Sequence, residues 1–478
     1  MSNHDNHPTS QLPDYITSAK PLGAEARAPW YKNVAPTYAG IFLWFVFWQD
    51  AVKSDGLGGA LSQGLGVALL GLVLAAAICH FLFYLVPGLL GMKTGLPLYI
   101  VGTSTFGTQG GLIMPGFLMG ILQFGWLGVN AFASSLALSA VIPIKAEILM
   151  VVWGFLAAFV GLKGIQYVAK VSTYLPLIPL IILVLMLFKT LGTVGSFEPQ
   201  TIIDAHRTVL PNAPAALSAF GVIAFLLTYV VGFFATAGAA GVDIAMSSRN
   251  ESDVKKGGLV GIALATLVTA GISAVVVAGV FGSKELSAQA VAAAQAAAEN
   301  KDQFLLRSTN MISVVMGSGL GKWLLFALAV AAFPSACFSA LIAANSFKTT
   351  MPKVNPFLSV GIGATVSVIL AVTGLAGKVV PVFVIIGASF GPICGAMMVD
   401  YLLAGQKWSG PRAGFNPAGW IAWALGFIVG ILPNLGCNVP AAPVAAFIVG
   451  AVVYWICAKS GMMSAVVPLP AANTPANK

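Results

Sequence analysis

The chain has 478 residues, of which 58% are hydrophobic and only 8% are charged, and its formal net charge is +9. An ordinary soluble domain is roughly 25% charged, so these proportions exclude a protein that is surrounded mainly by water. The positive charge does not indicate nucleic-acid binding, because the Lys and Arg residues are spread along the chain and form no basic cluster. We therefore expect an integral membrane protein made of α-helices.

Long apolar segments follow a polar beginning. The first 34 residues lack the apolar stretch of a secretory signal peptide, and we expect residues 1–34 to form a cytoplasmic tail. Residues 35–460 form the predicted membrane domain, and residues 461–478 form a second tail. Because a span needs about 20 apolar residues to cross roughly 30 Å of hydrocarbon, hydropathy predicts about twelve spans. They lie near residues 35–54, 60–88, 111–141, 146–162, 172–191, 214–243, 258–282, 320–347, 356–376, 379–403, 416–434 and 440–458.

The distribution of basic residues predicts which side of the membrane each loop faces. An even number of spans places both termini on one side, and fifteen of the 24 Lys and Arg residues then lie on that side. Basic residues in short loops favour the cytoplasm, so we expect a multi-pass protein of the inner or plasma membrane with both termini cytoplasmic. The two longest loops, residues 192–213 and 283–319, then lie outside the cell, and a surface helix is predicted over residues 287–300.

Few residues have the chemistry of a catalytic or metal centre. The five cysteines are scattered without the spacing of a metal site, and four of them lie in apolar stretches, as is typical of packing residues. His80 and His206 have no His, Asp or Glu at ligand spacing. Ionisable residues are almost absent from the spans, and the sequence contains no Gly-x-x-x-x-Gly-Lys-Ser/Thr motif. We therefore expect no enzyme, no ATP-driven pump and no resident cofactor.

A set of short motifs occurs in a fixed order. They are Leu43-Trp44, Gly58-Gly59, Gly64-Leu65, Gly91-Met-Lys-Thr-Gly-Leu-Pro97, Ser104-Thr-Phe-Gly107, Gly125-Trp126-Leu-Gly-Val-Asn130, Gly241-Val-Asp243, Ser248-Arg249-Asn250, Asp400-Tyr-Leu-Leu and Asn416-Pro-Ala-Gly-Trp420. In this order and spacing, residues 35–460 resemble the nucleobase:cation symporter family, which includes cytosine, purine, allantoin and hydantoin permeases. The likeness is greatest to members of the bacterial cytosine permease type.

The resemblance implies a LeuT-type fold, in which spans one to five and spans six to ten are inverted repeats. Here the repeats would cover residues 35–191 and 214–403, and two further helices would cover residues 416–458. In such folds the substrate lies near the middle of the membrane, beside interrupted helices from each repeat. Composition and spacing are compatible with this fold but do not predict it.

The third span carries Gln123, Trp126 and Asn130 on one face, because they are spaced i, i+3 and i+7. An indole offers a flat surface for a planar heterocycle, and amides can bind donors and acceptors on its edges. By the resemblance, Trp126 and Gln123 correspond to the stacking tryptophan and the amide of cytosine permeases. Asn130 corresponds to a contacting glutamine of hydantoin transport proteins. Without the resemblance, a packing tryptophan with two satisfied amides is the simpler interpretation.

The sixth span contains Phe234 and Thr236 within a glycine-rich stretch, residues 232–241. The resemblance implies that both side chains line the substrate pocket from the second repeat. Broken helices occur at membrane depth where neighbouring groups or a cavity satisfy the freed backbone. We expect such an interruption here, although glycine also serves close helix packing.

The first span carries Gln49, Asp50 and Lys53 in an otherwise apolar, aromatic segment. Ionisable groups in the bilayer are costly and are functional candidates by default. Asp50 is predicted to help bind a cation, to carry a proton, or to pair with Lys53 at i, i+3. Alternatively, the span ends near Trp48, and the polar residues lie at the outer interface. The resemblance implies that the main chain at Val46 and Gln49 coordinates sodium, and we also expect Gln49 to contact the substrate.

The eighth span departs from the family pattern. Where the family has two adjacent hydroxyl residues at its sodium site, this chain has Ser335-Ala336, with a further hydroxyl at Ser339. One expected ligand is therefore missing. The coupling ion stays open between Na+ at Val46, Gln49 and Ser335, a proton on Asp50, and no ion at all. Pro334 additionally predicts an interruption of this span.

These features predict a secondary transporter that imports a small planar nitrogen heterocycle by alternating access, coupled to a cation or a proton. The alternative is a transporter of a small anionic or other non-nucleobase solute, which an inward-pointing Lys53 would favour. A channel is less compatible, because the sequence contains no recognisable selectivity element. Since the expected fold is complete in one chain, we expect a monomer in the lipid bilayer, with a small molecule as its only other partner.

Overall fold

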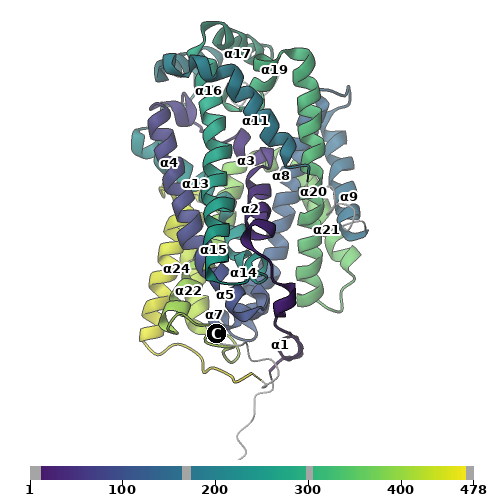
Figure 1. Ribbon diagram of the computed structural model, residues 1–478, viewed down its shortest axis with the longest axis vertical. Coiled ribbons are helices and arrows are strands. Elements are labelled where there is room, and N and C mark those ends of the chain that lie inside the picture. The colour runs from purple at the N-terminus through teal and green to yellow at the C-terminus, as the bar shows by residue number, and fades with distance from the viewer. Residues whose placement is uncertain (1–11, 164–173, 298–304, 470–478) are drawn as a thin grey trace, which may run out of the picture.

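The computed structural model describes residues 12–163, 174–297 and 305–469. These residues form helices joined by loops, and β pairing among them is limited to two isolated bridges, Ala28 with Ser248 and Arg412 with Val466. The molecule is elongated, and its long helices run mainly along the long axis (Figure 1). The prediction of an all-α membrane protein is confirmed.

The expected spans of the first half are helical. They contain α2 (Val34–Phe42), α3 (Phe45–Gln49), α4 (Leu65–Ile78), η4 (Cys79–Tyr84), α5 (Leu85–Thr94), η5 (Leu112–Phe117), α8 (Leu118–Ser139), α9 (Ala146–Lys163), α11 (Leu177–Thr190) and η6 (Leu191–Ser196). Consecutive members such as α4, η4 and α5 form one continuous helix. Helices dominate because hydrocarbon offers no partner to backbone N–H and C=O groups, which must bond within the segment.

The second half follows the same plan. It contains α13 (Ala219–Ala239), α14 (Gly241–Ala245), α15 (Glu251–Gly258), η7 (Leu259–Leu264), η8 (Leu267–Gly271), α16 (Ile272–Gly282), α20 (Ser318–Thr350), α21 (Pro356–Val372), α22 (Val379–Leu403), α23 (Pro417–Ile431) and α24 (Ala442–Lys459).

Short helices occupy the tail and the loops. They are α1 (Asp14–Thr17), η1 (Ala24–Ala26), η2 (Trp30–Lys32), η3 (Gly59–Leu61), α6 (Leu98–Val101), α7 (Thr103–Phe106), α12 (Pro199–Val209), α17 (Lys284–Ala296), α19 (Met311–Met316), η9 (Leu375–Gly377) and η10 (Leu432–Leu435). α17 confirms the predicted surface helix as far as Ala296, and residues 298–300 lie outside the described part of the chain.

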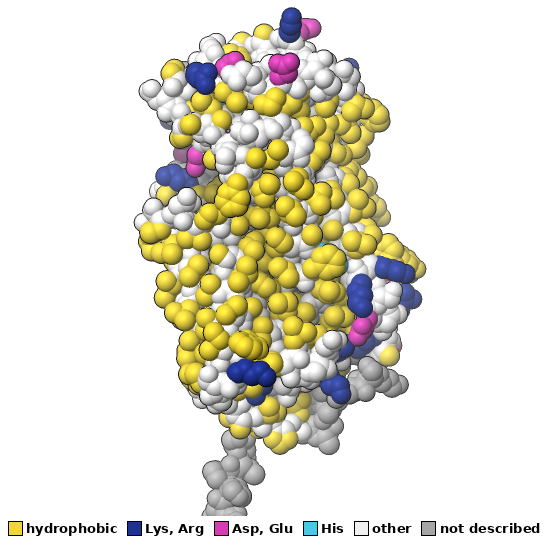
Figure 2. Space-filling view, turned by 90° about the vertical axis from the view of Figure 1, so that its left-hand side faces the viewer, with side chains coloured by type: hydrophobic (Ala, Val, Ile, Leu, Met, Phe, Trp, Pro, Cys, Tyr) yellow, Lys and Arg dark blue, Asp and Glu magenta, His cyan; other side chains and the backbone are white. Residues whose placement is uncertain are grey.

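Within the described residues, ten helices are long and apolar enough to cross a membrane. The other two predicted spans are helical but shorter: α21 has 17 residues, and the first span is divided into α2 and α3. On the face shown in Figure 2, hydrophobic side chains cover a broad region between the two charged ends of the molecule. Such a surface is suited to hydrocarbon between two aqueous interfaces.

The sixth span is interrupted within the predicted glycine-rich stretch, at Ala240 between α13 and α14, whereas the eighth span is not interrupted at Pro334. α13 continues to Ala239, and α20 passes through Pro334 without ending. Gly232 serves packing instead, because a Cβ atom there would lie 2.6 Å from the carbonyl oxygen of Phe383 in α22. The first span is interrupted as well, where Trp44 adopts an extended backbone with φ −61° and ψ 121°.

The long helices form two groups whose members pack closely with one another. α8, α9, α20 and α21 form one group, and α4, α5, α13, α22 and α24 form the other. α22 of the second group contacts α8, and so does α3 of the first span. The largest buried aromatic side chains, including Trp48, Phe47 and Phe233, concentrate in the same core.

The described part of the predicted N-terminal tail is packed against the membrane domain. The hydroxyl of Tyr15 donates a hydrogen bond to the carbonyl of Thr108. The amide of Asn33 donates to the carbonyl of Ile244 at 2.7 Å. Residues 12–33 therefore cover the end of the bundle at which the chain begins (Figure 1).

Candidate functional site

An aromatic cluster surrounds Trp126, a buried residue of α8. Its ring centroid lies 5.1 Å from that of Phe233 in α13, 5.4 Å from that of Phe383 in α22, and 5.5 Å from that of Trp44 between α2 and α3. The corresponding interplanar angles are 83°, 40° and 59°. These are tilted and edge-to-face arrangements, which aromatic rings prefer over a face-to-face sandwich. Four segments that are distant in sequence thus converge on one indole.

Polar groups lie along one side of this cluster. The indole nitrogen of Trp126 donates to the hydroxyl of Thr236 at 3.3 Å, which joins α8 to α13. Gln123, one helical turn earlier, is 6% exposed, and its amide donates to the sulfur of Met119 at 3.6 Å. Because a thioether is a weak acceptor, the Gln123 amide can exchange this contact for a stronger one. The predicted residues Gln123, Trp126 and Thr236 therefore lie close together, and all three are buried.

Asn130 is engaged elsewhere. Its amide nitrogen donates to the carbonyl of Ala332 in α20 at 3.0 Å. Its amide oxygen accepts from the indole of Trp153 in α9 at 3.0 Å and from the hydroxyl of Ser134 at 3.3 Å. In this structure Asn130 joins α8 to α9 and α20, and it contributes nothing to the aromatic cluster.

Phe234 is fully buried, but it faces α2. Its ring stacks on Phe42 with 5.6 Å between centroids and 14° between planes, and it lies 5.6 Å from Tyr38. Successive residues of an α-helix point about 100° apart, so a difference of one position moves the side chain to another face. Phe233, and not the predicted Phe234, is the α13 ring that contacts Trp126.

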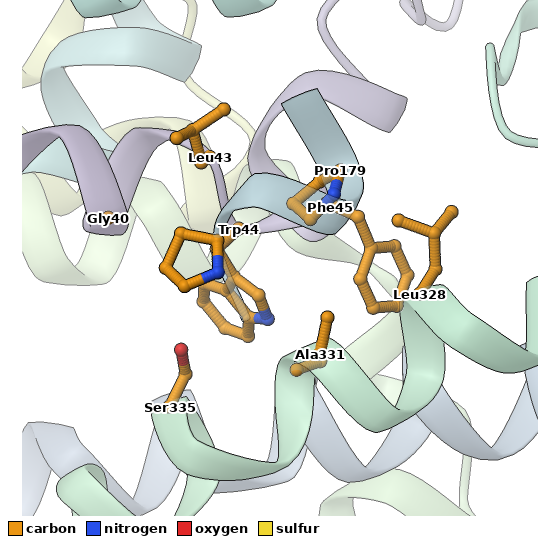
Figure 3. A pocket seen from close by; sticks show the side chains of 10 residues that line it. Gly40, Leu43, Trp44, Phe45, Pro179, Leu328, Ala331 and Ser335 are labelled. Atoms are coloured by element: carbon orange, nitrogen blue, oxygen red, sulfur yellow. The ribbon is translucent and has the colours of Figure 1, made fainter. Parts of the chain in front are cut away.

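A small cavity of about 20 Å³ adjoins the cluster at the break between α2 and α3. Its lining residues, most of which are labelled in Figure 3, are Gly40, Leu43, Trp44, Phe45, Pro176, Pro179, Leu328, Ala331, Ala332 and Ser335. The side chain of Ser335 points towards the Trp44 indole across the cavity (Figure 3). The cavity is walled by the interrupted first span, by α11 and by α20.

Of the predicted ion-coupling residues, Ser335 borders this cavity. Ser339 lies one turn further along α20 and donates to the carbonyl of Ser335 at 3.2 Å. The main-chain oxygen of Val46 accepts a hydrogen bond from the hydroxyl of Tyr229 at 3.2 Å. The first span thus leaves helical geometry near Leu43. This break comes before Val46 and Gln49, whose main chain the family resemblance assigns to sodium coordination.

Gln49 and Asp50 lie at the C-terminal end of α3 and contact a loop segment, residues 305–310. The side-chain oxygen of Gln49 accepts from the hydroxyl of Thr309 at 2.9 Å, and its main-chain oxygen accepts from the amide of Ser308 at 3.1 Å. A carboxylate oxygen of Asp50 accepts from Nε of Arg307 at 2.7 Å. Asp50 is 1% exposed, so it does not lie at an open interface, and its ion-pair partner is Arg307.

Sequence reasoning missed three members of the site region: Phe233, Phe383 and Arg307. Phe is frequent in any apolar span, so no local signal separates Phe233 from its neighbour. Arg307 lies in a long loop, where no periodicity predicts a partner. Trp44 belongs to a motif that the sequence analysis identified, but no sequence signal predicted that it lies at a helix break.

The described residues contain no group of three or more His, Cys, Asp and Glu side chains that could hold a metal ion. The hydroxyls of Ser335 and Thr236 supply oxygen atoms at the cavity and beside Trp126. Such groups suit a weakly held alkali cation, since hard cations take oxygen ligands.

Comparison with curated proteins finds one group of relatives. The cytosine permeases of Escherichia coli strains K12 and CFT073 are each 25% identical to this chain over 199 residues, which is 40% of the chain and 43% of the permease. The cytosine permease of Escherichia coli O157:H7 matches equally. The matched part thus spans less than half the length of these relatives. No protein-family model matches the chain.

Solved structures resemble nearly the whole chain. The inward-facing conformation of Mhp1 aligns with a TM-score of 0.64 and 16% identity, covering 94% of this chain and 95% of that one. A closed conformation of Mhp1 with bromovinylhydantoin bound, described as a nucleobase-cation-symport-1 family transporter, aligns with a TM-score of 0.58 and 14% identity, covering 95% and 98%. A Na+-coupled sialic acid symporter aligns with a TM-score of 0.57 and 17% identity, covering 95% and 93%. The chain therefore has the LeuT-type fold, and the resemblance to the nucleobase:cation symporter family that its motifs predicted is confirmed.

Proposed function

We propose that this protein is a secondary active transporter that imports a small planar nitrogen heterocycle of the cytosine, purine or hydantoin class. The observation that carries the proposal is the contact of Trp126 with Thr236, which unites an indole from the first half of the chain with a hydroxyl from the second. The cytosine permeases and the bromovinylhydantoin-bound Mhp1 support this substrate class. These relatives are transporters by name, which also argues against an enzyme.

The chemistry of the cluster suits a flat, uncharged ring. Stacking of a base on an aromatic side chain contributes about 1–3 kcal/mol in complexes with single-stranded nucleic acid. Gln123 offers a donor and an acceptor, and Thr236 offers a hydroxyl, so amide-like edges can be bound. The described residues in ring contact with Trp126 are all uncharged, so an anionic solute would lack a counter-charge there. This argument disfavours the alternative of an anionic substrate.

Substrate binding requires the site to open. A cavity of about 20 Å³ has room for roughly one water molecule, which is far less than a heterocycle needs. The pairs Asp50–Arg307 and Gln49–Thr309 hold the loop segment 305–310 against the outer end of α3. In the proposed cycle of alternating access, this outer contact opens when the substrate enters from outside.

We infer that transport is coupled to a cation that binds beside Ser335. The Ser335 hydroxyl and the main chain at the break near Leu43 supply oxygen atoms at the cavity, as interrupted helices do in transporters of this kind. The Na+-coupled sialic acid symporter shares the fold. Asp50 is less suited to carry the ion, because Arg307 already neutralises it. Ala336 replaces the family's second hydroxyl, so the experiment must compare Na+ with a proton.

Membrane placement is part of the same proposal. We infer a monomer in the inner or plasma membrane with both termini cytoplasmic, and with repeats over residues 35–191 and 214–403. The excess of basic residues on the proposed cytoplasmic side supports the orientation. Labelling of single cysteines placed at residues 192 and 407 from outside intact cells checks it: the first is expected to react and the second to be protected.

Uptake into proteoliposomes tests the function. We expect saturable uptake of labelled cytosine, adenine or hydantoin that increases when an inward Na+ or proton gradient is imposed. Trp126→Ala is expected to weaken binding at least about tenfold through lost stacking, whereas Trp323→Ala, at a 69% exposed tryptophan, leaves it unchanged. Full affinity in Trp126→Ala would contradict the site. Uptake that is indifferent to both gradients would contradict the coupling but not facilitated transport.

A further inference from the structure

Trp44 occupies an unusual position for a tryptophan. It is the residue between α2 and α3, where the first span leaves helical geometry. Its indole nitrogen is buried and has no hydrogen-bond partner among the described residues. Buried tryptophan N–H groups ordinarily have a partner, and an unpaired one loses the hydrogen bond that water would otherwise provide. The structure therefore presents a donor that lacks an acceptor.

This donor faces the cavity beside the aromatic cluster. Trp44 lines the cavity together with Ala331 and Ser335, and Figure 3 shows its indole between these residues, with the nitrogen edge on the Ala331 side. Its ring lies 5.5 Å from Trp126 at 59°, and 6.4 Å from Phe233. A ring that stacks on Trp126 would thus present its edge, and not its face, to the Trp44 indole.

We propose that Trp44 is a second substrate-binding tryptophan, which donates its indole N–H to a carbonyl oxygen on the edge of the heterocycle. This inference rests on the proposed function and deepens it. A carbonyl oxygen suits the role because it projects beyond the ring and has two lone pairs. Trp126 then selects for a flat ring, and Trp44 selects among flat rings for those that carry an oxo group. Because Trp44 lies at the helix break, movement of α3 relative to α2 carries this donor towards or away from the substrate.

Two variants separate the N–H from the ring. Trp44→Phe keeps an aromatic side chain and removes the donor. Trp48→Phe is the matched control, since Trp48 is also buried with an unpartnered indole nitrogen but does not line the cavity. The probes are cytosine and 4-aminopyrimidine, which lacks the oxo group of cytosine and its ring N1–H. We measure competition of each against labelled cytosine in proteoliposomes, and the melting temperature of each purified variant.

The expected result is that wild type and Trp48→Phe prefer cytosine over 4-aminopyrimidine by about tenfold, the size of one hydrogen bond to a buried donor. In Trp44→Phe this preference falls to within about twofold, and 4-aminopyrimidine binds as it does to wild type. If Trp44→Phe does not fold, benzothienylalanine at position 44 keeps the ring size and removes the N–H, and the same result is expected.

A preference for cytosine that survives the loss of the Trp44 N–H overturns the inference, as does an equal loss in Trp44→Phe and Trp48→Phe. These outcomes leave the proposed function intact, since wild type still transports cytosine. Wild-type protein that neither binds nor transports cytosine, adenine or hydantoin overturns the proposed function instead, and this inference with it.

Discussion

Asp50 and Arg307 are 257 positions apart in the chain and form an ion pair in which the two side chains are 1% and 9% exposed. One carboxylate oxygen of Asp50 bonds Arg307, and the other is buried without a hydrogen-bond partner. Such a pair gains little over two apolar residues, but removing one partner leaves a buried charge uncompensated. Replacing one member of the pair should therefore destabilise the protein more than replacing both.

Arg307→Met is therefore expected to lower the free energy of unfolding by about 3–5 kcal/mol. The double variant Asp50→Asn with Arg307→Met should recover most of this loss, because no charge remains buried. Arg207→Met is the control: its partner is Asp204, both side chains are more than half exposed, and its loss should cost no more than about 1 kcal/mol. Unfolding in detergent measures all three. Equal effects of Arg307→Met and Arg207→Met would show that the buried pair has no special role.

At the scale of elements, α8 is held in place by side chains that sequence reasoning assigned to the substrate. Asn130 bonds the main chain of α20 and the indole of Trp153 in α9. Gln123, on the same helix, has only a thioether partner. Two amides on the same face of α8 therefore differ: hydrogen bonds to two other helices fix Asn130, and no such bond is seen for Gln123 among the described residues.

Asn130→Ala is expected to destabilise the fold while leaving substrate affinity within about twofold. It leaves the N–H of Trp153 without its acceptor, at about 1–3 kcal/mol, and removes the second hydrogen bond to the carbonyl of Ala332. Gln123→Ala is expected to do the reverse, with lost affinity and an unchanged melting temperature. Competition binding and thermal unfolding of both variants check this. Lost affinity with full stability in Asn130→Ala would instead restore Asn130 as a substrate contact.

The family motifs also act as packing elements. Gly91 lies against α14, where a Cβ atom would be 2.0 Å from the carbonyl oxygen of Val242. The neighbouring Asp243 accepts a hydrogen bond from the amide of Leu98 at 3.0 Å. The second-span motif that begins at Gly91 and the sixth-span motif that ends at Asp243 thus bind each other, outside the aromatic cluster.

Gly91→Ala is expected to prevent or strongly weaken folding, since the backbone of α14 must move to make room for the methyl group. Gly66→Ala, in α4 with nothing within 4 Å of the added atom, should be neutral or stabilising by up to about 1 kcal/mol, the helix-propensity difference. The yield of monodisperse protein in size-exclusion chromatography and the melting temperature distinguish them. Normal behaviour of Gly91→Ala would mean that α5 and α14 are not in close contact.

At the scale of the whole molecule, the aromatic cluster around Trp126 lies where the two helix groups meet. Trp126 belongs to the group of α8, α9, α20 and α21, and its partners Phe233 and Phe383 belong to the other. Ser335 in α20 likewise faces the break in the first span. A ligand beside Trp126 therefore contacts both groups, and one beside Ser335 contacts the first group and the interrupted first span. This arrangement lets binding bias the relative position of these elements.

Ser335→Ala is expected to raise the cation concentration needed for half-maximal uptake about tenfold or more, if one of few oxygen ligands is lost. Ser339→Ala, which removes a hydroxyl one turn away from the cavity, should change it less than twofold. Uptake measured against Na+ at fixed pH, and against pH without Na+, identifies the ion. Equal responses of the two variants would argue against a cation beside Ser335.

The sequence by itself determined the class of the protein, its spans and the family that it resembles. Each predicted span contains a helix, because apolar side chains suit hydrocarbon and a helix bonds its own backbone in the absence of water. Ordered glycine, proline and aromatic motifs then showed the resemblance to the family although identity to relatives is low. These signals are local or follow chain order, so one sequence is enough to detect them.

Only the tertiary structure decided which side chains meet. The rotation of α13 about its axis turns Phe233 towards Trp126 and Phe234 towards α2, and packing sets that rotation. The break at Trp44 occurs without a proline at that position, whereas Pro334 lies within a continuous helix. The pairing of Asp50 with Arg307 spans 257 positions and leaves no pattern in either segment. Such contacts depend on how separate helices pack, and no local periodicity contains that information.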